Sequence, residues 1–182
     1  MGDEMLVRNC APTLAGIKTG NMFSRPFEDE QKMRSYVRAL NASLRKKGLR
    51  VIPLRYKNGN GLIYVYRPAF LTRDLGNTDA ARILEKQGYE NVSADICVSR
   101  LKRKLEENDT FPHEIGLFLG YPPEDVNGFI KDSRGCKYSG LWKVYGDVEK
   151  AKSLFSKYKR CTASYCALHK KGKSIDGLAV VS

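Results

Sequence analysis

Residues 50–68 read RVIPLRYKNGNGLIYVYRP, and this stretch decides the fold class. Two runs rich in β-branched and tyrosine residues flank Asn58-Gly59-Asn60-Gly61, a turn composition that reverses the chain between adjacent strands. The pattern predicts a β-hairpin over residues 50–67. Pro53 has no amide hydrogen to donate, so its strand is expected to have one unpaired side or a local break in its pairing.

Helices are predicted on both sides of the hairpin. Residues 27–50 carry apolar residues at helical spacing between an acidic start and Gly48, which is expected to end the helix. Other helices are predicted over residues 68–88, after Ser93, twice within 111–130, and after Asp147.

Two more strands complete the prediction. Residues 139–145 are predicted to form one, and the tail GLAVVS (177–182) could form another, whereas residues 5–25 show no clear pattern. The elements do not alternate regularly as in a doubly wound sheet. The sequence therefore predicts an α+β fold, in which a small, mainly antiparallel sheet of three to four strands is covered by about six helices.

Length and composition indicate a single globular domain over residues 1–182, with 42% hydrophobic and 29% charged residues. No stretch approaches the roughly 18 apolar residues that a membrane-spanning helix needs. The first twenty residues contain no continuous apolar segment typical of a secretion signal, so the expected location is the cytoplasm and no membrane partner is expected.

The cysteines and histidines exclude the common metal and disulfide patterns. The five cysteines are irregularly spaced, no CxxC pair occurs, and the chain has only two histidines. We therefore expect free thiols and no structural zinc site. The cofactor is unknown, and binding of haem or iron by His113 or a cysteine is a further alternative.

Charge is distributed unevenly along the chain. The formal net charge is +12, of which residues 151–182 contribute +6, while seven acidic residues and one lysine lie between Glu106 and Asp132. A basic surface of this kind favours an anionic partner, whether an acidic protein, a nucleic acid or a phosphorylated ligand. Lys157 and Arg160, on the side of the last helix opposite its apolar stripe, are candidate contacts.

Residues 111–130, FPHEIGLFLGYPPEDVNGFI, stand within the acidic segment; we call them the corner segment. Pro112 and Glu114 suit the start of a helix, and Gly120 with the prolines after it suits a stop and restart. His113 is not explained by capping and is a candidate base or ligand in a first helical turn, with Glu114 and Tyr121 as candidate binding residues. A helix-turn-helix is disfavoured because carboxylates would face DNA phosphates.

Cys10 is the candidate nucleophile. It precedes Pro12, a plausible helix start, and Lys18 follows about two turns later; both features would stabilise a thiolate. With His113 as acid or base, Cys10 would make a thiol-dependent enzyme, whereas the alternative is a buried, inert cysteine. RNA or DNA binding is a further alternative, with basic clusters at residues 99–107 and 169–173 and with Tyr56, Tyr64 and Tyr66 as possible stacking groups.

Three stretches carry a resemblance to a known family: CAPTLAGIKTGNMFS (10–24), HEIGLFLGYPPEDVNGFI (113–130) and SGLWKVYGDVEKAKSLFSKYKRC (139–161). Through them the chain resembles the bacterial (Firmicutes) family catalogued as domain of unknown function number 3793. The resemblance implies a cytosolic bacterial protein in a redox or iron-related setting, with an acidic flavodoxin-like protein as a possible partner. It implies no catalytic residue. The leading hypothesis is a basic binding or accessory protein for an anionic partner.

Overall fold

Residues 2–90 and 93–181 are described by a computed structural model of the chain. They form two compact units: unit 1 comprises residues 1–70 and 161–182, and unit 2 comprises residues 71–160. Helices and small antiparallel sheets make up the chain, which confirms the α+β class. The single domain predicted from length stays a prediction.

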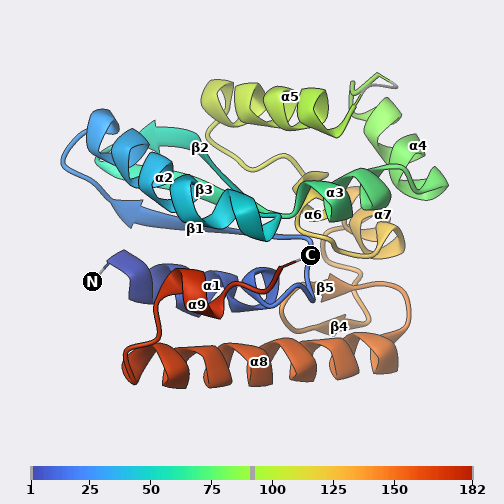
Figure 1. Cartoon of the computed structure of the whole chain (residues 1–182). Coiled ribbons are helices and arrows are strands. Elements are labelled where there is room, and N and C mark those ends of the chain that lie inside the picture. Colours follow the sequence, from blue (N-terminus) through green and yellow to red (C-terminus); the bar gives the residue numbers. More distant parts are fainter. Residues whose placement is uncertain (1, 91–92, 182) are drawn as a thin grey trace. The chain divides into compact units, whose positions relative to one another are not determined.

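Unit 1 is built on a three-stranded antiparallel sheet of β1 (Gly20–Pro26), β2 (Arg50–Lys57) and β3 (Asn60–Tyr66), in the order β1-β3-β2 (Figure 1). The predicted hairpin is confirmed as β2 and β3, and its turn places Asn58 and Gly59 at φ values of 50° and 74°. Both expectations for Pro53 are confirmed, because β2 is an edge strand and its register shifts between Pro53 and Arg55.

The third strand comes from the region without a clear pattern. β1 pairs with β3 from Gly20 opposite Tyr66 to Pro26 opposite Asn60. The tail does not form a strand: α9 (Ile175–Leu178) replaces it, with Ser174 Oγ accepting from Gly177 N at 3.1 Å. The prediction of a C-terminal strand was therefore wrong, since a serine cap begins a short helix there.

Helices α1 (Gly2–Leu14) and α2 (Glu30–Leu44) supply the rest of the unit 1 core, and η1 (Arg45–Lys47) extends α2. Asp29 caps α2 by accepting from Lys32 N at 2.7 Å, and Gly48 follows η1 with φ 77°, as the sequence predicts. The apolar cluster joins Leu6 and Leu14 of α1 to Leu40 of α2 and to Ile63 and Val65 of β3.

Arg67, directly after β3, is fully buried within unit 1. Its guanidinium donates to the carbonyls of Thr13 (2.8 Å), Leu14 (2.8 Å), Lys47 (3.2 Å) and Val180 (2.8 Å). The Arg67 side chain thus connects the C-terminal ends of α1 and η1 with the C-terminal tail through hydrogen bonds. Helix ends leave carbonyls without intrahelical partners, and here an arginine serves them.

Unit 2 is mainly helical. Its helices are the greater part of α3 (Pro68–Leu75), then α4 (Thr78–Lys86), α5 (Ala94–Glu107), α6 (Ile115–Phe118), α7 (Pro123–Lys131) and the first part of α8 (Val148–Lys170). Asn77, Ser93 and Asp147 cap α4, α5 and α8 with their short polar side chains, and the helix starts after Ser93 and Asp147 are those that the sequence predicts.

The predicted strand over 139–145 is instead a small hairpin of β4 (Tyr138–Ser139) and β5 (Lys143–Val144). This two-stranded sheet is separate from the sheet of unit 1, so the prediction of a third strand there was wrong. The turn at Gly140 lies against α8, where an added Cβ would come within 2.3 Å of the Phe155 ring. Glycine at this position allows the hairpin to pack on the helix.

Candidate functional site

The corner segment contains two helices, but the first is shorter than predicted. α6 begins at Ile115, whose N–H donates to Pro112 O at 3.1 Å, so Pro112 and His113 precede the helix. Gly120 has φ 76° after α6 and Pro123 begins α7, as predicted. Since α6 has only four residues and His113 lies before it, the expectation that His113 lies in a first helical turn was wrong.

Glu114 has a structural role in unit 2. It is 1% exposed, and its carboxylate pairs with Lys104 Nζ at 2.6 Å. Lys104 also donates to Gln87 O and lies 4.5 Å from the centre of the Tyr89 ring. Although Glu114 directly precedes α6, its side chain makes no capping hydrogen bond there. This ion pair joins α5 to the corner segment.

Asp125, in the first turn of α7, orients the only tryptophan of the chain. Its carboxylate accepts from Trp142 Nε1 at 2.8 Å, from Tyr145 N at 2.8 Å and from Gly146 N at 2.9 Å. The Trp142 indole stacks on Tyr121, with ring centres 4.4 Å apart, and meets Phe155 of α8 edge-on at 4.5 Å. The corner segment and the β4–β5 hairpin are thereby held together.

These contacts enclose a pocket of about 440 Å³, which we call the corner pocket. It is bounded by residues 111–129 and 141–143, with walls that include Phe111, Ile115, Leu119, Tyr121, Phe129 and Trp142. Its volume falls within the range of about 300–1,000 Å³ typical of small-molecule sites. Phe111 and Leu141 are 49% and 45% exposed, so apolar surface continues out of the pocket to solvent.

His113 and Lys143 add an imidazole and an amine to this largely apolar lining. His113 is exposed, and its ring meets Phe129 edge-on at 5.1 Å. Lys143 Nζ lies 5.6 Å from the centre of the same ring and donates to Ser133 O at 2.5 Å. Two of the predicted site residues, His113 and Tyr121, therefore lie at one pocket.

Cys10 lies deep in unit 1. It falls within α1, not before a new helix at Pro12 as predicted, and is 0% exposed. Burial raises the pKa of the Cys10 thiol well above its usual range, although Lys18 acts in the opposite direction. The reactive form of a cysteine is the thiolate, so this environment disfavours a nucleophile. His113 belongs to unit 2 and its pairing with Cys10 stays a prediction.

Lys18 is the charged neighbour of Cys10. It is 7% exposed, and its ammonium donates to the carbonyl of Gly20. Burial lowers the pKa of Lys18 to about 7, so a substantial fraction of this amine is neutral at neutral pH. A buried amine beside a buried thiol is unsuited to contact a large partner.

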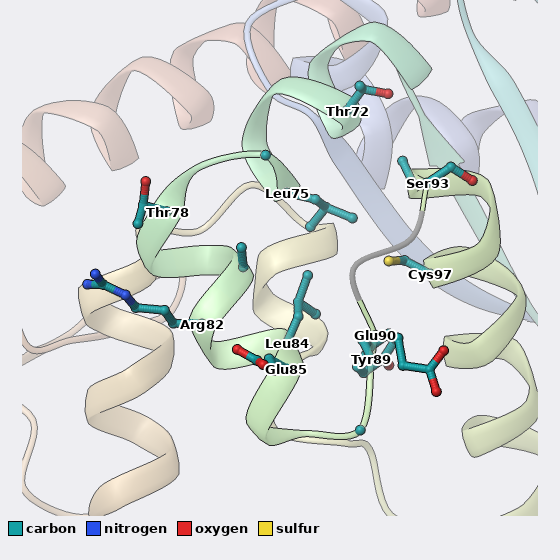
Figure 2. Close-up of a pocket in the computed structure, with 14 residues that line it drawn as sticks. Thr72, Leu75, Thr78, Arg82, Leu84, Glu85, Tyr89, Glu90, Ser93 and Cys97 are labelled. Carbon is teal, nitrogen blue, oxygen red and sulfur yellow. The ribbon is translucent and has the colours of Figure 1, made fainter.

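A second hollow in unit 2, of about 860 Å³, lies among α3, α4 and α5 (Figure 2). Arg82, Glu85 and Glu90 line it together with Cys97. Two of its charged groups already have ion-pair partners: Arg82 pairs with Asp79 at 3.4 Å and Glu90 with Arg100 at 3.2 Å. The corner pocket is lined mainly by apolar side chains, whereas this hollow is lined by a mixture of charged, polar and apolar ones.

The outer side of α8 carries the remaining predicted residues, Lys157 and Arg160. We call the exposed basic residues of this helix within unit 2 the α8 basic face: Lys150, Lys152, Lys157, Lys159 and Arg160. The opposite side of the same stretch is buried through Ala151, Phe155 and Tyr158. Folding of the amphipathic helix thus gathers the positive charges on one surface.

Several functional candidates were missed by sequence reasoning. Phe129 was not singled out within the corner segment, and Trp142 and Lys143 were expected in a strand of the main sheet. A lone tryptophan after a Ser-Gly turn was an available signal, because tryptophan often marks sites with one apolar and one polar neighbour.

Among the helices of the described residues, none is both long and apolar enough to cross a bilayer. Within residues 2–90 and 93–181, no group of three or more histidine, cysteine or acidic side chains is placed to hold a metal ion.

Comparison with known proteins identifies the family. No curated protein and no solved structure matches the chain. A family model described as "Protein of unknown function (DUF3793)" matches residues 6–179, which include both units almost completely. The chain therefore belongs to the DUF3793 family.

Proposed function

We propose that this chain is a binding protein whose α8 basic face engages an acidic protein. The observation that carries the proposal is the concentration of five exposed basic side chains within residues 150–160. Glu149 is the one acidic residue of α8, and it pairs with Lys152 at 3.0 Å. Like charges on one helix face repel each other, and an acidic partner would relieve that repulsion.

An acidic protein fits this surface better than single-stranded nucleic acid. Proteins that bind single strands usually combine a basic groove with aromatic side chains on which bases stack. Tyr64 and Tyr66, two of the predicted stacking residues, are 0% and 3% exposed. Ser153 and Ser156 stand between the cations of the α8 basic face and offer no aromatic surface. Tyr138, which is 37% exposed and whose ring centre lies 5.2 Å from Lys152 Nζ, adds a single ring beside the face and not a series of them.

The partner we propose is an acidic flavodoxin-like protein, as the family resemblance implies. Recognition would be dominated by long-range attraction, because the cations lie at the ends of flexible, exposed side chains. Such binding weakens as salt rises, since the Debye length falls from about 30 Å at 0.01 M to about 8 Å at 0.15 M.

The test is a titration of the protein with a purified acidic flavodoxin at 20 and 200 mM salt, with RNA and DNA of matched charge as parallel probes. Charge reversal of four residues (Lys150, Lys157, Lys159 and Arg160, each to Glu) should weaken flavodoxin binding roughly 100-fold, from about 0.7 kcal/mol for each exposed pair.

A matched control reverses four exposed basic residues of unit 1, namely Arg8, Arg38, Arg45 and Lys46. It changes the net charge by the same amount and should retain most of the affinity. Equal losses in the two variants would show that net charge alone is responsible and would contradict the proposal. Binding of RNA or DNA without flavodoxin binding would favour the nucleic-acid alternative instead.

A further inference from the structure

We propose that the corner pocket binds a small organic acid with an apolar body. Its carboxylate would lie beside Lys143 and His113, and its body would lie against Trp142 and Tyr121. This is a second site, independent of the α8 basic face.

The apolar body follows from the walls. Ile115, Leu119 and Val126 line the pocket with aliphatic carbon, and Tyr121 and Trp142 add stacked aromatic rings. A volume of about 440 Å³ lies within the range of about 300–1,000 Å³ that is usual for small-molecule sites, so the pocket suits a small apolar body.

The wall groups that could recognise other polar ligands are already engaged. Asp125 lines the pocket, but one of its oxygens accepts from Trp142 Nε1 and the other from Tyr145 N and Gly146 N. The indole N–H of Trp142 is likewise engaged, because it donates to Asp125. Asp125 is 3% exposed and three of its roughly four acceptor sites are occupied, so it has little capacity left to bind a cationic ligand directly.

The charge of the ligand follows from Lys143 and His113. Both lie against the Phe129 ring, with Lys143 Nζ 5.6 Å from its centre and the His113 ring centre 5.1 Å away. An ammonium has three N–H donors, so Lys143 can bind a carboxylate while donating to Ser133 O. The imidazole of His113 can donate a second hydrogen bond, and both groups favour an anionic oxygen over a neutral one.

Glu114, the acid nearest to His113 in sequence, does not oppose this charge. It is buried and paired with Lys104 on the other side of the turn, where a smaller polar hollow of about 320 Å³ lies. His113 lines both hollows and so stands at their boundary.

Trp142 provides a built-in reporter because it is the only tryptophan in the chain and forms a wall of the pocket. We would titrate the intact protein with decanoate below its micelle concentration and follow tryptophan emission. Decanol and decylamine, with the same body and a different head group, should bind at least ten times more weakly. Naphthylacetate would distinguish an aromatic from an alkyl body.

Variants locate the site. Lys143→Met should weaken decanoate binding about tenfold or more. Lys137→Met is the control and should leave binding unchanged, because Lys137 is also a lysine that donates to a backbone carbonyl of this region, Gly146 O at 3.2 Å, but lies outside the pocket. Phe111→Ser, which removes an exposed wall residue, should weaken every ligand of the series. Ile96→Ser is its control, since Ile96 is 46% exposed and lies outside the pocket.

Two outcomes would overturn the proposal. If decanoate and naphthylacetate at millimolar concentration leave both Trp142 emission and the protein's thermal midpoint unchanged, the pocket does not bind this class. If decanol binds as tightly as decanoate, or Lys143→Met binds as wild type, the assignment of the acid group is wrong. The α8 charge-reversal variant should keep decanoate binding, so failure of one proposal is distinguishable from failure of the other.

Discussion

Replacement of Asp125 should destabilise unit 2 by an amount that its hydrogen bonds predict. This carboxylate is 3% exposed and accepts three N–H donors, two on one oxygen and the Trp142 indole on the other. Asp125→Ala leaves all three donors without their acceptor. Asp125→Asn is nearly isosteric, and its remaining oxygen can still accept from Tyr145 N and Gly146 N.

The two variants therefore have different expected costs. A buried donor left unsatisfied costs about 1–3 kcal/mol, and less where water can reach it. Trp142 is buried, whereas Tyr145 and Gly146 are half-buried, so we expect Asp125→Ala to lose roughly 3–5 kcal/mol of unfolding free energy. Asp125→Asn places an NH₂ group against the indole N–H and should lose about 1–3 kcal/mol.

Urea unfolding followed by Trp142 emission measures these costs, and circular dichroism gives a second probe of the same transition. Asp132→Asn is the control. Asp132 is exposed and accepts from Arg134 N at 3.0 Å, so this variant should lose less than about 1 kcal/mol of unfolding free energy. If Asp125→Ala were no less stable than Asp132→Asn, the carboxylate would not hold Trp142 in place. The same result would remove the argument that Asp125 is unavailable to ligands.

Three further outcomes are expected in unit 1. A lysine at position 67 cannot donate to four carbonyls, so Arg67→Lys should lower the free energy of unfolding by about 2–4 kcal/mol. It should also speed hydrogen exchange at the Val180 amide, which donates to Leu14 O at 2.9 Å. Unchanged exchange at that amide would contradict the role of Arg67. Native Cys10 should react with iodoacetamide roughly 100-fold more slowly than half-buried Cys136, because it is buried and its pKa is raised; equal rates would restore Cys10 as a nucleophile candidate. Unfolded lysine titrates near 10.4, whereas the pKa of folded Lys18 is about 7, so between these values the unfolded state binds more protons and Lys18 makes stability rise with pH. Lys18→Met should remove that rise when urea midpoints at pH 7 and 8.5 are compared; a rise equal to that of wild type would refute the assignment.

Local chemistry made much of the fold predictable. The hairpin at Asn58-Gly59, the acidic start of α2 and the stop at Gly48 each depend on neighbours in sequence, and all three are confirmed. β1 was not predictable in this way, because its pairing with β3 joins residues about forty positions apart. Short strands such as β4 and β5 carry too few residues for an alternating pattern to appear.

The candidate site was predictable only in part, for the same reason. His113 and Tyr121 could be selected from the corner segment alone, although their environment could not. The pocket also needs Trp142 and Lys143 from the β4–β5 hairpin, whose docking depends on the hydrogen bonds of Asp125. Burial of Cys10 likewise follows from residues of α2 and β3 packing around α1, which no local pattern reveals.

The position of Arg67 has a consequence for biosynthesis. A ribosome releases the chain from its N-terminus, and residues 71–160 of unit 2 are made before the second part of unit 1 exists. Val180 follows Arg67 by 113 positions, which takes roughly 6–23 s at about 5–20 residues per second. During that interval the guanidinium lacks one of its four carbonyl partners, and unit 2 can fold while unit 1 is still open. The nascent protein should therefore acquire its corner pocket first and close unit 1 last.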